Sequence, residues 1–213
     1  MQINPVIIFG AGPLGLVALD IFRANDIVVY GFLDDDAKLH GTTVQEVPVL
    51  GSTDDDGFLK LIGQKCDAFI AVDDVRLRKS LTEMLNTRRK VQPANAVHPA
   101  ATVAASASLS YGCMVGPGAV VNSGATLGAH VLVHAGAVVD AQAQVEDFVQ
   151  IGARALVGMG ATLQAEAFVG AGAVVVPGLQ VGKSARVGAG SVVVESVPAK
   201  ATVFGNPAAK VSA

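Results

Sequence analysis

The first part of the 213-residue chain alternates short apolar runs with segments of helical character. Buried strands are predicted at Val6–Phe9, Val28–Leu33 and Ala68–Val72. Helices are predicted at Leu14–Ala24, Asp54–Gly63 and Val75–Thr87, the last of which repeats apolar residues at helical spacing. Strand and helix in repetition favour a small parallel sheet with helices on its faces, so residues 1–93 are interpreted as a Rossmann-like α/β domain.

The hydrophobic pattern changes after Pro93, where a strict period of six residues begins. Seventeen consecutive sixes, counted from Val97, all begin with Val, Ile or Leu, and 13 of them carry Ala, Ser or Cys in the fifth position. This pattern is typical of a parallel β-helix in which three short strands make one triangular coil and residues eighteen apart stack. Glycine clusters in the second and fourth positions, where corners can need a positive φ. Residues 94–213 are therefore predicted to form this second domain.

The composition limits the kinds of partner. Only eight of the 102 positions in the repeat are Asp, Glu, Lys or Arg, so flat Val/Ala faces are expected on an isolated prism and a homotrimer is predicted to cover them. The net charge of −3, without a Lys/Arg cluster, argues against nucleic acid. No apolar run is long enough for a membrane span and no secretory signal begins the chain, so a cytoplasmic protein is expected. Cys66 and Cys113 lack the spacing of a metal site and are predicted to be buried thiols.

The segment FGAGPLG follows the first predicted strand and opens the first predicted helix. Gly10, Gly12 and Gly15 match the pattern G-x-G-x-x-G, whose backbone N–H groups can meet a phosphate. About 20 residues later, Asp34 or Asp35 could accept hydrogen bonds from a ribose or a base edge. The alternative is a tight turn followed by a solvated acidic loop. A dinucleotide would make the protein an NAD enzyme, but the α/β segment is short for a full doubly wound domain, so a mononucleotide-linked sugar fits better.

The repeats, the closing segment GSVVVESVPAKATVFGNPAAKV and the preceding α/β domain together carry a family resemblance. The chain resembles the bacterial sugar acyltransferases of the sialic acid O-acetyltransferase and bacillosamine or perosamine N-acetyltransferase group. The resemblance implies a left-handed β-helix and an acetyl-CoA-dependent transfer to a hydroxyl or amine of a nucleotide-linked sugar in glycan biosynthesis. It further implies that the α/β domain holds the nucleotide, that the thioester of CoA lies between neighbouring prisms of a trimer, and that no metal is used.

The chain departs from this family at several positions. The family usually has Gly and His where Pro13 and Leu14 stand here. Family members place an acid-His-acid triplet at the register of Asp140, so the position of the catalytic base is occupied by Ala141. They often carry a second His at the register of Gln150. The segment VDDVRLR (Val72–Arg78) resembles the family's glycine-aspartate-asparagine turn with its following arginine, and Arg76 is expected to be structural there.

His134 is the predicted substitute for the missing base. It lies seven residues before Ala141, on the rim expected for the same groove between subunits, with Asp140 or a carboxylate of the neighbouring chain orienting it. The alternative is a polar residue exposed on a prism face. His40 and His98 are not expected to be catalytic. The spacing of His130 and His134 does not fit the zinc site of trimeric hexapeptide carbonic anhydrases, so no zinc is expected.

The predicted CoA groove consists of small residues and backbone amides. Residues that line it in the family correspond to Gly158, Met159, Gly170, Ala171, Gly188 and Ala189, which are expected at matching heights on successive coils. The phosphates of CoA could meet Lys183, Arg186, Lys200 and Lys210. The alternative for the glycines is corner geometry, which does not exclude binding.

Three functions remain open at this point. The first is an active sugar acetyltransferase with a rearranged base, and the second is a catalytically impaired homologue that binds a nucleotide sugar or CoA as a non-enzymatic partner. If the acceptor is an amine that arrives neutral, positioning alone supplies much of the rate and a base matters less. The first two functions are then harder to tell apart from the missing base. The third, a purely structural β-helix, is disfavoured by the attached α/β domain and the GNPA ending.

Overall fold

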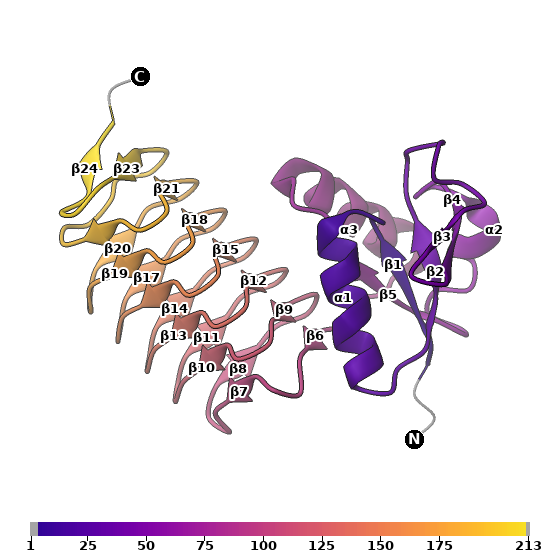
Figure 1. Ribbon diagram of the computed structural model, residues 1–213, viewed down its shortest axis with the longest axis horizontal. Coiled ribbons are helices and arrows are strands. Elements are labelled where there is room, and N and C mark those ends of the chain that lie inside the picture. Colours follow the sequence, from indigo (N-terminus) through magenta and orange to yellow (C-terminus); the bar gives the residue numbers. More distant parts are fainter. Residues whose placement is uncertain (1–3, 212–213) are drawn as a thin grey trace. The chain divides into compact units, whose positions relative to one another are not determined.

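The computed structural model describes residues 4–211. The chain divides into two compact units between Ala96 and Val97 (Figure 1). The domain limits proposed from the sequence, 1–93 and 94–213, lie just before this division. No helix within the described residues has the length and hydrophobicity needed to cross a membrane.

The N-terminal unit is a five-stranded sheet with helices on both faces. Its strand order is β3-β4-β2-β1-β5, formed by β1 (Val6–Phe9), β2 (Val29–Leu33), β3 (Thr43–Val44), β4 (Val47–Gly51) and β5 (Asp67–Ile70). The helices are α1 (Pro13–Ala24), α2 (Asp56–Leu59) and α3 (Val75–Arg89). The Phe22 ring of α1 meets the Phe69 ring of β5 edge-on at 5.6 Å, whereas Ile70 belongs to the core that includes Leu81 and Leu85 of α3. Because successive residues of a strand face opposite sides, α1 and α3 cover opposite faces.

The hairpin formed by β3 and β4 was not predicted from the sequence. These strands pair antiparallel, and the turn between them places Gln45 and Glu46 at φ angles of 45° and 68°. Such turns usually carry Asn or Gly, so this one lacks the residues that make a hairpin recognisable. Pro48 in β4 also weakens the strand pattern.

The buried arginine after β5 is Arg78, and the prediction that Arg76 fills this structural role is wrong. Arg76 is exposed, whereas Arg78 is fully buried and its guanidinium donates to the carbonyl of Val72 at 2.6 Å. Burial lowers the pKa of Arg78 to about 10, and nearby Asp73 and Asp74 oppose this shift. Arg78 therefore stays charged at neutral pH and ties the start of α3 to the end of β5.

The C-terminal unit is a left-handed parallel β-helix with three sheets. We call them sheet I, sheet II and sheet III, in the order in which the chain visits them. Sheet I contains β6 (Ala96–Val97), β9 (Met114–Val115), β12 (Leu132–Val133), β15 (Gln150–Ile151), β18 (Phe168–Val169), β21 (Arg186–Val187), β23 (Thr202–Phe204) and β24 (Ala209–Lys210). Sheet II contains β7 (Thr102–Val103), β10 (Val120–Val121), β13 (Val138–Val139), β16 (Leu156–Val157), β19 (Val174–Val175) and β22 (Val192–Val193). Sheet III contains β8 (Ser108–Leu109), β11 (Thr126–Leu127), β14 (Gln144–Val145), β17 (Thr162–Leu163) and β20 (Gln180–Val181).

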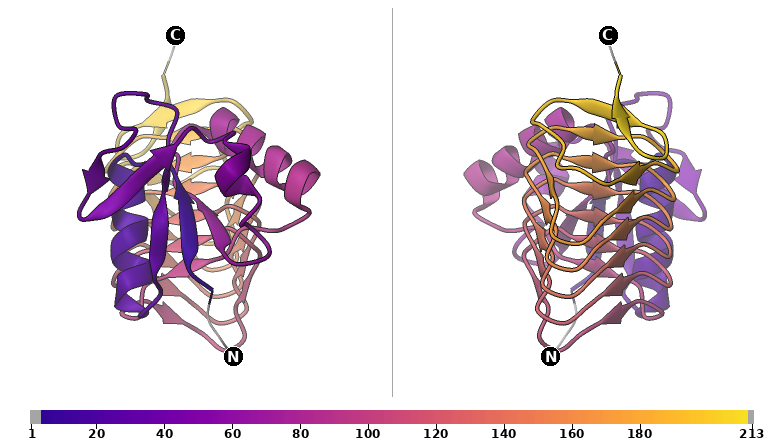
Figure 2. Two further views of the ribbon diagram at one scale, coloured as in Figure 1. Left: turned by 90° about the vertical axis from the view of Figure 1, so that its right-hand side faces the viewer. Right: turned by 90° about the vertical axis from the view of Figure 1, so that its left-hand side faces the viewer.

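The predicted stacking at eighteen residues is confirmed by the strand register. Val120 pairs with Val138, and Leu132 pairs with Gln150, in parallel ladders. Figure 2 shows the strands of successive coils stacked on one another. The first and fifth residues of the sixes point inward and form one continuous core of Val, Ile, Leu and Ala. Only the last pair, β23 and β24, is antiparallel among the described strands of this unit.

The corners use glycine for two different reasons. From Gly112 to Gly190 the fourth-position residues have a positive φ whether they are glycine or not, as at Gly136 (67°), Gln142 (58°) and Phe148 (60°). Second-position glycines lie outside this region. A Cβ on Gly152 would lie 2.5 Å from the backbone nitrogen of Ala171 in the next coil. The expectation of positive φ therefore holds for the fourth position, whereas the second is small because coils approach closely there.

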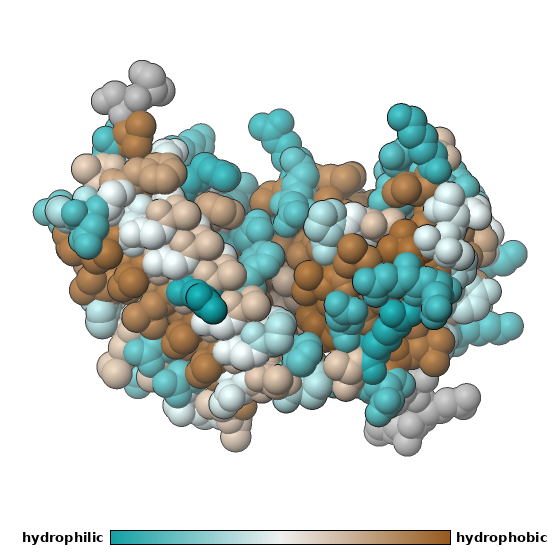
Figure 3. Space-filling model, in the orientation of Figure 1, coloured by the Kyte–Doolittle hydropathy of each residue, from teal (hydrophilic) through white to brown (hydrophobic). Residues whose placement is uncertain are grey.

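The outer faces of the sheets differ in polarity. On sheet II the outward residues from β10 onward are aliphatic and partly exposed, whereas Thr102 of β7 is exposed; the aliphatic residues are Val120, Val138, Leu156, Val174 and Val192. On sheet III they are polar: Ser108, Thr126, Gln144, Thr162 and Gln180. Rows of hydrophobic residues are visible on this unit in Figure 3. The sequence thus leaves one apolar flat face on the β-helix of a single chain.

Candidate functional site

The glycine-rich turn between β1 and α1 is shaped by close backbone approach. Gly10 has a φ of 103°, and a Cβ there would lie 2.6 Å from the carbonyl oxygen of Ala71. A Cβ on Gly15 would collide with the carbonyl of Gly10, whereas Gly12 has open space around it. Gly12 is the N-cap of α1 and no side chain caps the helix there. The start of α1 therefore presents exposed backbone, which is the arrangement that binds phosphates.

Asp34 and Asp35 follow β2 and both have partners within the unit. Asp34 Oδ2 accepts a hydrogen bond from the backbone N–H of Ala11 at 2.7 Å, which fixes the glycine-rich turn. Asp35 Oδ1 accepts from the backbone N–H and the hydroxyl of Thr53 at 2.8 and 2.9 Å. Their binding of a ribose or base edge stays a prediction. Leu14 is buried, so the polar side chain expected there in the family is replaced by a core residue.

Asp140 lies at the corner between sheets II and III, directly after β13. Its Oδ1 accepts from Asn122 Nδ2 at 3.0 Å and from the backbone N–H of Ala141 at 2.7 Å. Both hydrogen bonds use the same oxygen, which fixes the carboxylate and leaves Oδ2 available for another donor. The partly buried Ala141 stands beside it and supplies only its backbone.

His134 lies at the corner between sheets I and II, directly after β12 and four residues before β13 begins. Its Nε2 is 3.1 Å from Nε2 of Gln150, which points outward from sheet I. His134 and Asp140 thus lie on opposite sides of β13, His134 before the strand and Asp140 directly after it. Among the described residues of one chain, the hydrogen bonds of the Asp140 carboxylate go to Asn122 and Ala141 and not to His134. An intrachain pair of His134 with Asp140 is therefore not formed.

His130 is a core residue at the third corner. It is fully buried, its ring stacks on Phe148 at 4.9 Å and meets the ring of Tyr111 edge-on at 5.5 Å. His130 and His134 lie at the two ends of β12. Within residues 4–211, no group of three His, Cys, Asp or Glu side chains is arranged to hold a metal ion.

A ladder of backbone amides runs along the corner between sheets I and II. It consists of the N–H groups of the exposed third-position residues, one coil apart: Ala135, Ala153, Ala171 and Ala189. No acceptor for these four N–H groups is found among the described residues of the chain. We call this feature the amide ladder. Stacked strands place its donors about 4.8 Å apart.

At the corner between sheets III and I, some of the equivalent amides donate to side chains. The N–H of Ala129 donates to Asp147 at 2.7 Å, and that of Ala165 donates to Glu146 at 2.8 Å. The corner of the amide ladder carries Gly-Ala in three of these four coils and His134-Ala135 in the first. The signal was present in the sequence as a Gly-Ala pair that recurs every eighteen residues from Gly152 to Ala189.

The residues predicted to line CoA fall on two corners. Gly170, Ala171, Gly188 and Ala189 stack on the corner of the amide ladder. Gly158 and Met159 instead lie at the corner of Asp140, so the expected single column is not observed for this pair. Met159 is 53% exposed.

The cations predicted to meet the phosphates of CoA are also divided. Arg186 and Lys210 lie on sheet I, and Lys183 and Lys200 lie at the corner between sheets III and I. All four are exposed. The Arg186 guanidinium stacks over the ring of Phe168 at 4.6 Å.

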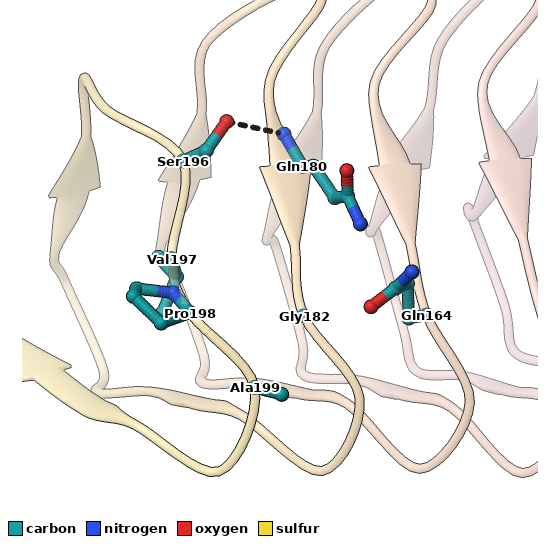
Figure 4. Close-up of a pocket in the computed structure, with 7 residues that line it drawn as sticks. All are labelled: Gln164, Gln180, Gly182, Ser196, Val197, Pro198 and Ala199. Atoms are coloured by element: carbon teal, nitrogen blue, oxygen red, sulfur yellow. Dashed lines mark hydrogen bonds between the residues drawn. The ribbon is translucent and has the colours of Figure 1, made fainter.

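A shallow pocket of about 270 Å³ lies at the last coil and contains none of the predicted residues. Gln164, Gln180, Gly182 and the segment 196–199 line it, and the backbone N–H of Gln180 donates to Ser196 Oγ at 3.1 Å (Figure 4).

A left-handed β-helix of hexapeptide repeats, with an apolar face bordered by the amide ladder, defines the class of hexapeptide acyltransferases. Residues 5–85 match the family model of the PglD N-terminal domain. Residues 111–141 and 165–195 match the hexapeptide repeat of succinyl-transferase.

Solved structures narrow the class. A histidine-to-alanine variant of GDP-perosamine N-acetyl transferase from Caulobacter crescentus, in complex with CoA and GDP-perosamine, is 31% identical with a TM-score of 0.91, and the match covers 100% of this chain and 99% of that one. The acetyltransferase domain of PglB from Neisseria gonorrhoeae FA1090, in complex with acetyl coenzyme A, is 28% identical with a TM-score of 0.81 over 99% and 100%. WeeI from Acinetobacter baumannii AYE is 25% identical with a TM-score of 0.87 over 98% and 100%. No curated protein matches significantly.

The chain belongs to the hexapeptide-repeat sugar acyltransferases. The family and the fold class predicted from the sequence are confirmed, and so is the assignment to acyltransferases.

Proposed function

We propose that this chain transfers an acetyl group from acetyl-CoA to an amine of a nucleotide-linked sugar in glycan biosynthesis. The observation that carries the proposal is the amide ladder, because four donors in a row beside small side chains suit an extended ligand with regularly spaced carbonyls. The pantetheine arm of CoA has this chemistry. The Caulobacter relative supports the acceptor class, since its histidine-to-alanine variant still holds both CoA and GDP-perosamine.

The nucleotide-linked sugar is proposed to bind through the N-terminal unit. The exposed start of α1 and the turn of Gly10, Gly12 and Gly15 suit its phosphates. Asp34 and Asp35 border this turn and offer further oxygen acceptors. Acetyl-CoA and nucleotide-linked sugars are cytoplasmic metabolites, so we propose this compartment for the enzyme.

A homotrimer completes the proposed groove. If three chains turn the apolar face of sheet II toward a threefold axis, the corner of the amide ladder in each chain adjoins the Asp140 corner of the next. His134 of one chain then lies on the same groove as the partner's Asp140, Gly158 and Met159. This arrangement explains why the predicted CoA residues occupy two corners, and it brings the partner's Asp140 carboxylate to the groove of His134.

The proposed reaction forms one bond and breaks one. The sugar amine attacks the thioester carbonyl, the C–S bond breaks, and the CoA thiolate leaves. His134 takes the proton of the attacking nitrogen and returns it to the sulfur, while the partner's Asp140 stabilises the imidazolium. Backbone N–H groups of the corner are placed to stabilise the oxyanion.

The proposal is tested by thiol release from acetyl-CoA with a panel of nucleotide-linked amino sugars. The wild type is expected to turn over at least one of them, and His134→Ala is expected to lower kcat by about 10²–10⁴-fold. His98→Ala is the matched control and should leave kcat unchanged. Unchanged turnover in His134→Ala rejects this histidine as the base.

A second candidate function rests on Ala141. The residue stands beside a fixed Asp140, at the register where the resembling family carries its base, which favours an impaired homologue that only binds CoA or a nucleotide sugar. Activity gained solely in Ala141→His would establish this second function, whereas activity in the wild type would exclude it.

A further inference from the structure

Gln150 and His134 form a pair across two strands of sheet I. The amide nitrogen of Gln150 lies 3.1 Å from Nε2 of His134. A side-chain amide nitrogen is a donor only, so Nε2 accepts this hydrogen bond and the ring proton resides on Nδ1. The contact therefore selects one tautomer of the neutral imidazole.

The surroundings of Gln150 hold its amide in place. In the outer column of sheet I it stands between Leu132 of the coil before and Phe168 of the coil after. Leu132 is fully buried and Phe168 is covered on one face by Arg186. Two apolar neighbours restrict the side chain, and the low polarity strengthens its hydrogen bond.

We propose that Gln150 is a positioning residue that keeps His134 neutral and oriented between turnovers, with the lone pair of Nε2 directed along the outer face of sheet I. This inference rests on the proposed function, in which His134 accepts the proton of the sugar amine. The amine needs the same lone pair, so the Gln150 amide yields to it during each turnover. A protonated Nε2 cannot accept from Gln150, so the pair disfavours a premature imidazolium.

Charged groups around His134 come from three elements. Arg154 follows β15 at the same corner, and a Cβ added to Gly136 would lie 3.4 Å from its Cγ. Arg186 lies on β21, three strands beyond β12 in sheet I. Asp140 lies at the far end of β13. Arg154 and Arg186 are cations and cannot accept a proton from the imidazole. Gln150 contacts His134 directly, so its replacement by a carboxylate should have the most direct effect on the imidazole.

The experiment follows the nitrogen chemical shifts of the histidines by NMR, with His134→Ala to assign the signal. In the wild type, His134 is expected as the Nδ1–H tautomer. In Gln150→Glu the carboxylate should stabilise the imidazolium and raise the pKa of His134 by about one unit or more. The acid limb of the kcat/KM profile should move to higher pH by the same amount. Gln150→Leu should mix the two tautomers and lower kcat about tenfold.

Gln144→Glu is the matched control, since Gln144 occupies the equivalent outward position on the preceding strand, β14 of sheet III. It should leave the pKa and the tautomer of His134 unchanged. An Nε2–H tautomer in the wild type, or an unchanged pKa in Gln150→Glu, overturns the inference. The NMR readout does not need turnover, so a chain that shows the pair without releasing thiol contradicts the proposed function and leaves the pairing established.

Discussion

Asn122 and Asp140 lie one coil apart on the same corner of the β-helix, and the Asn122 amide donates to Asp140 Oδ1 at 3.0 Å. Asn122 itself caps the next residue, because its Oδ1 accepts from the N–H of Ser123 at 2.8 Å. Asp140 makes the same cap to Ala141. The two residues thus perform one structural task, and only Asp140 adds a charge.

This relationship separates the charge of Asp140 from its capping role. Asp140→Asn keeps an oxygen for Asn122 and Ala141, so the free energy of unfolding should change by less than about 0.5 kcal/mol. If the carboxylate stabilises the imidazolium of a neighbouring chain, kcat should fall at least about tenfold, a barrier increase of about 1.4 kcal/mol. Thiol release and urea unfolding are measured side by side. Equal kcat in both proteins contradicts a catalytic role for the charge.

The amide ladder can be tested by deleting one donor. Ala171→Pro removes the N–H at a position where Pro117 already stands on the same corner, three coils earlier in the column, so the backbone admits proline. The Kd for CoA should rise about two- to tenfold, because one hydrogen bond contributes about 0.5–1.5 kcal/mol. Calorimetric titration measures it. Ala171→Ser keeps the N–H and should bind as the wild type does; equal weakening in both variants argues against the donor.

The trimer depends on the apolar face of sheet II. Leu156→Glu places a charge in the middle of this face and should dissociate the assembly. Light scattering should then give a mass near the 21.5 kDa of one chain, in place of about three times that for the wild type. Gln144→Glu on the polar sheet III should stay assembled. A wild-type mass near one chain contradicts the trimer outright.

The glycine-rich turn makes opposite predictions at two of its positions. Gly10→Ala puts a Cβ against the carbonyl of Ala71 in a left-handed conformation and should lower the free energy of unfolding by about 2–3 kcal/mol. Gly12→Ala meets open space and should be neutral in urea unfolding. If the turn binds phosphate, Gly12→Ala should still raise the KM for the nucleotide sugar, since the methyl group stands at the exposed start of α1. An unchanged KM contradicts that site.

Cys113 gives a pH dependence of stability with a definite sign. Burial raises the pKa of its thiol from 9.0 to about 11. The folded state therefore holds this proton more tightly than the unfolded chain, so the contribution is fully present below pH 9 and is lost between pH 9 and 11. The loss amounts to about 2–3 kcal/mol. Cys113→Ala, which carries the commonest residue of the fifth position, should remove this dependence when urea unfolding is compared at pH 8 and pH 10.5.

The difference between the two proteins is the relevant quantity, because other groups titrate in the same range. Identical losses in the wild type and in Cys113→Ala would contradict the assignment to this thiol.

The sequence by itself determined the β-helix, because a period of six leaves each inward position only one kind of partner, the residue eighteen further on. Val121 and Val139 could be paired without a structure. The same holds for the β1–α1 turn, since only glycine tolerates the backbone approach at Gly10. The hairpin of β3 and β4 could not be found, because Gln45 and Glu46 adopt their positive φ angles through the strands that they join.

Only the tertiary structure decided how the site is arranged. The pairing of Gln150 with His134 joins residues on neighbouring strands, and the direction of their side chains depends on packing between Leu132 and Phe168. Whether a corner amide is satisfied depends on which side chain stands above it in the next coil, as Asp147 does for Ala129. The separation of His134 from Asp140 along one strand likewise follows from the triangular cross-section. A period in sequence fixes which residues stack, whereas the reach and rotation of polar side chains are settled only once the coils are closed.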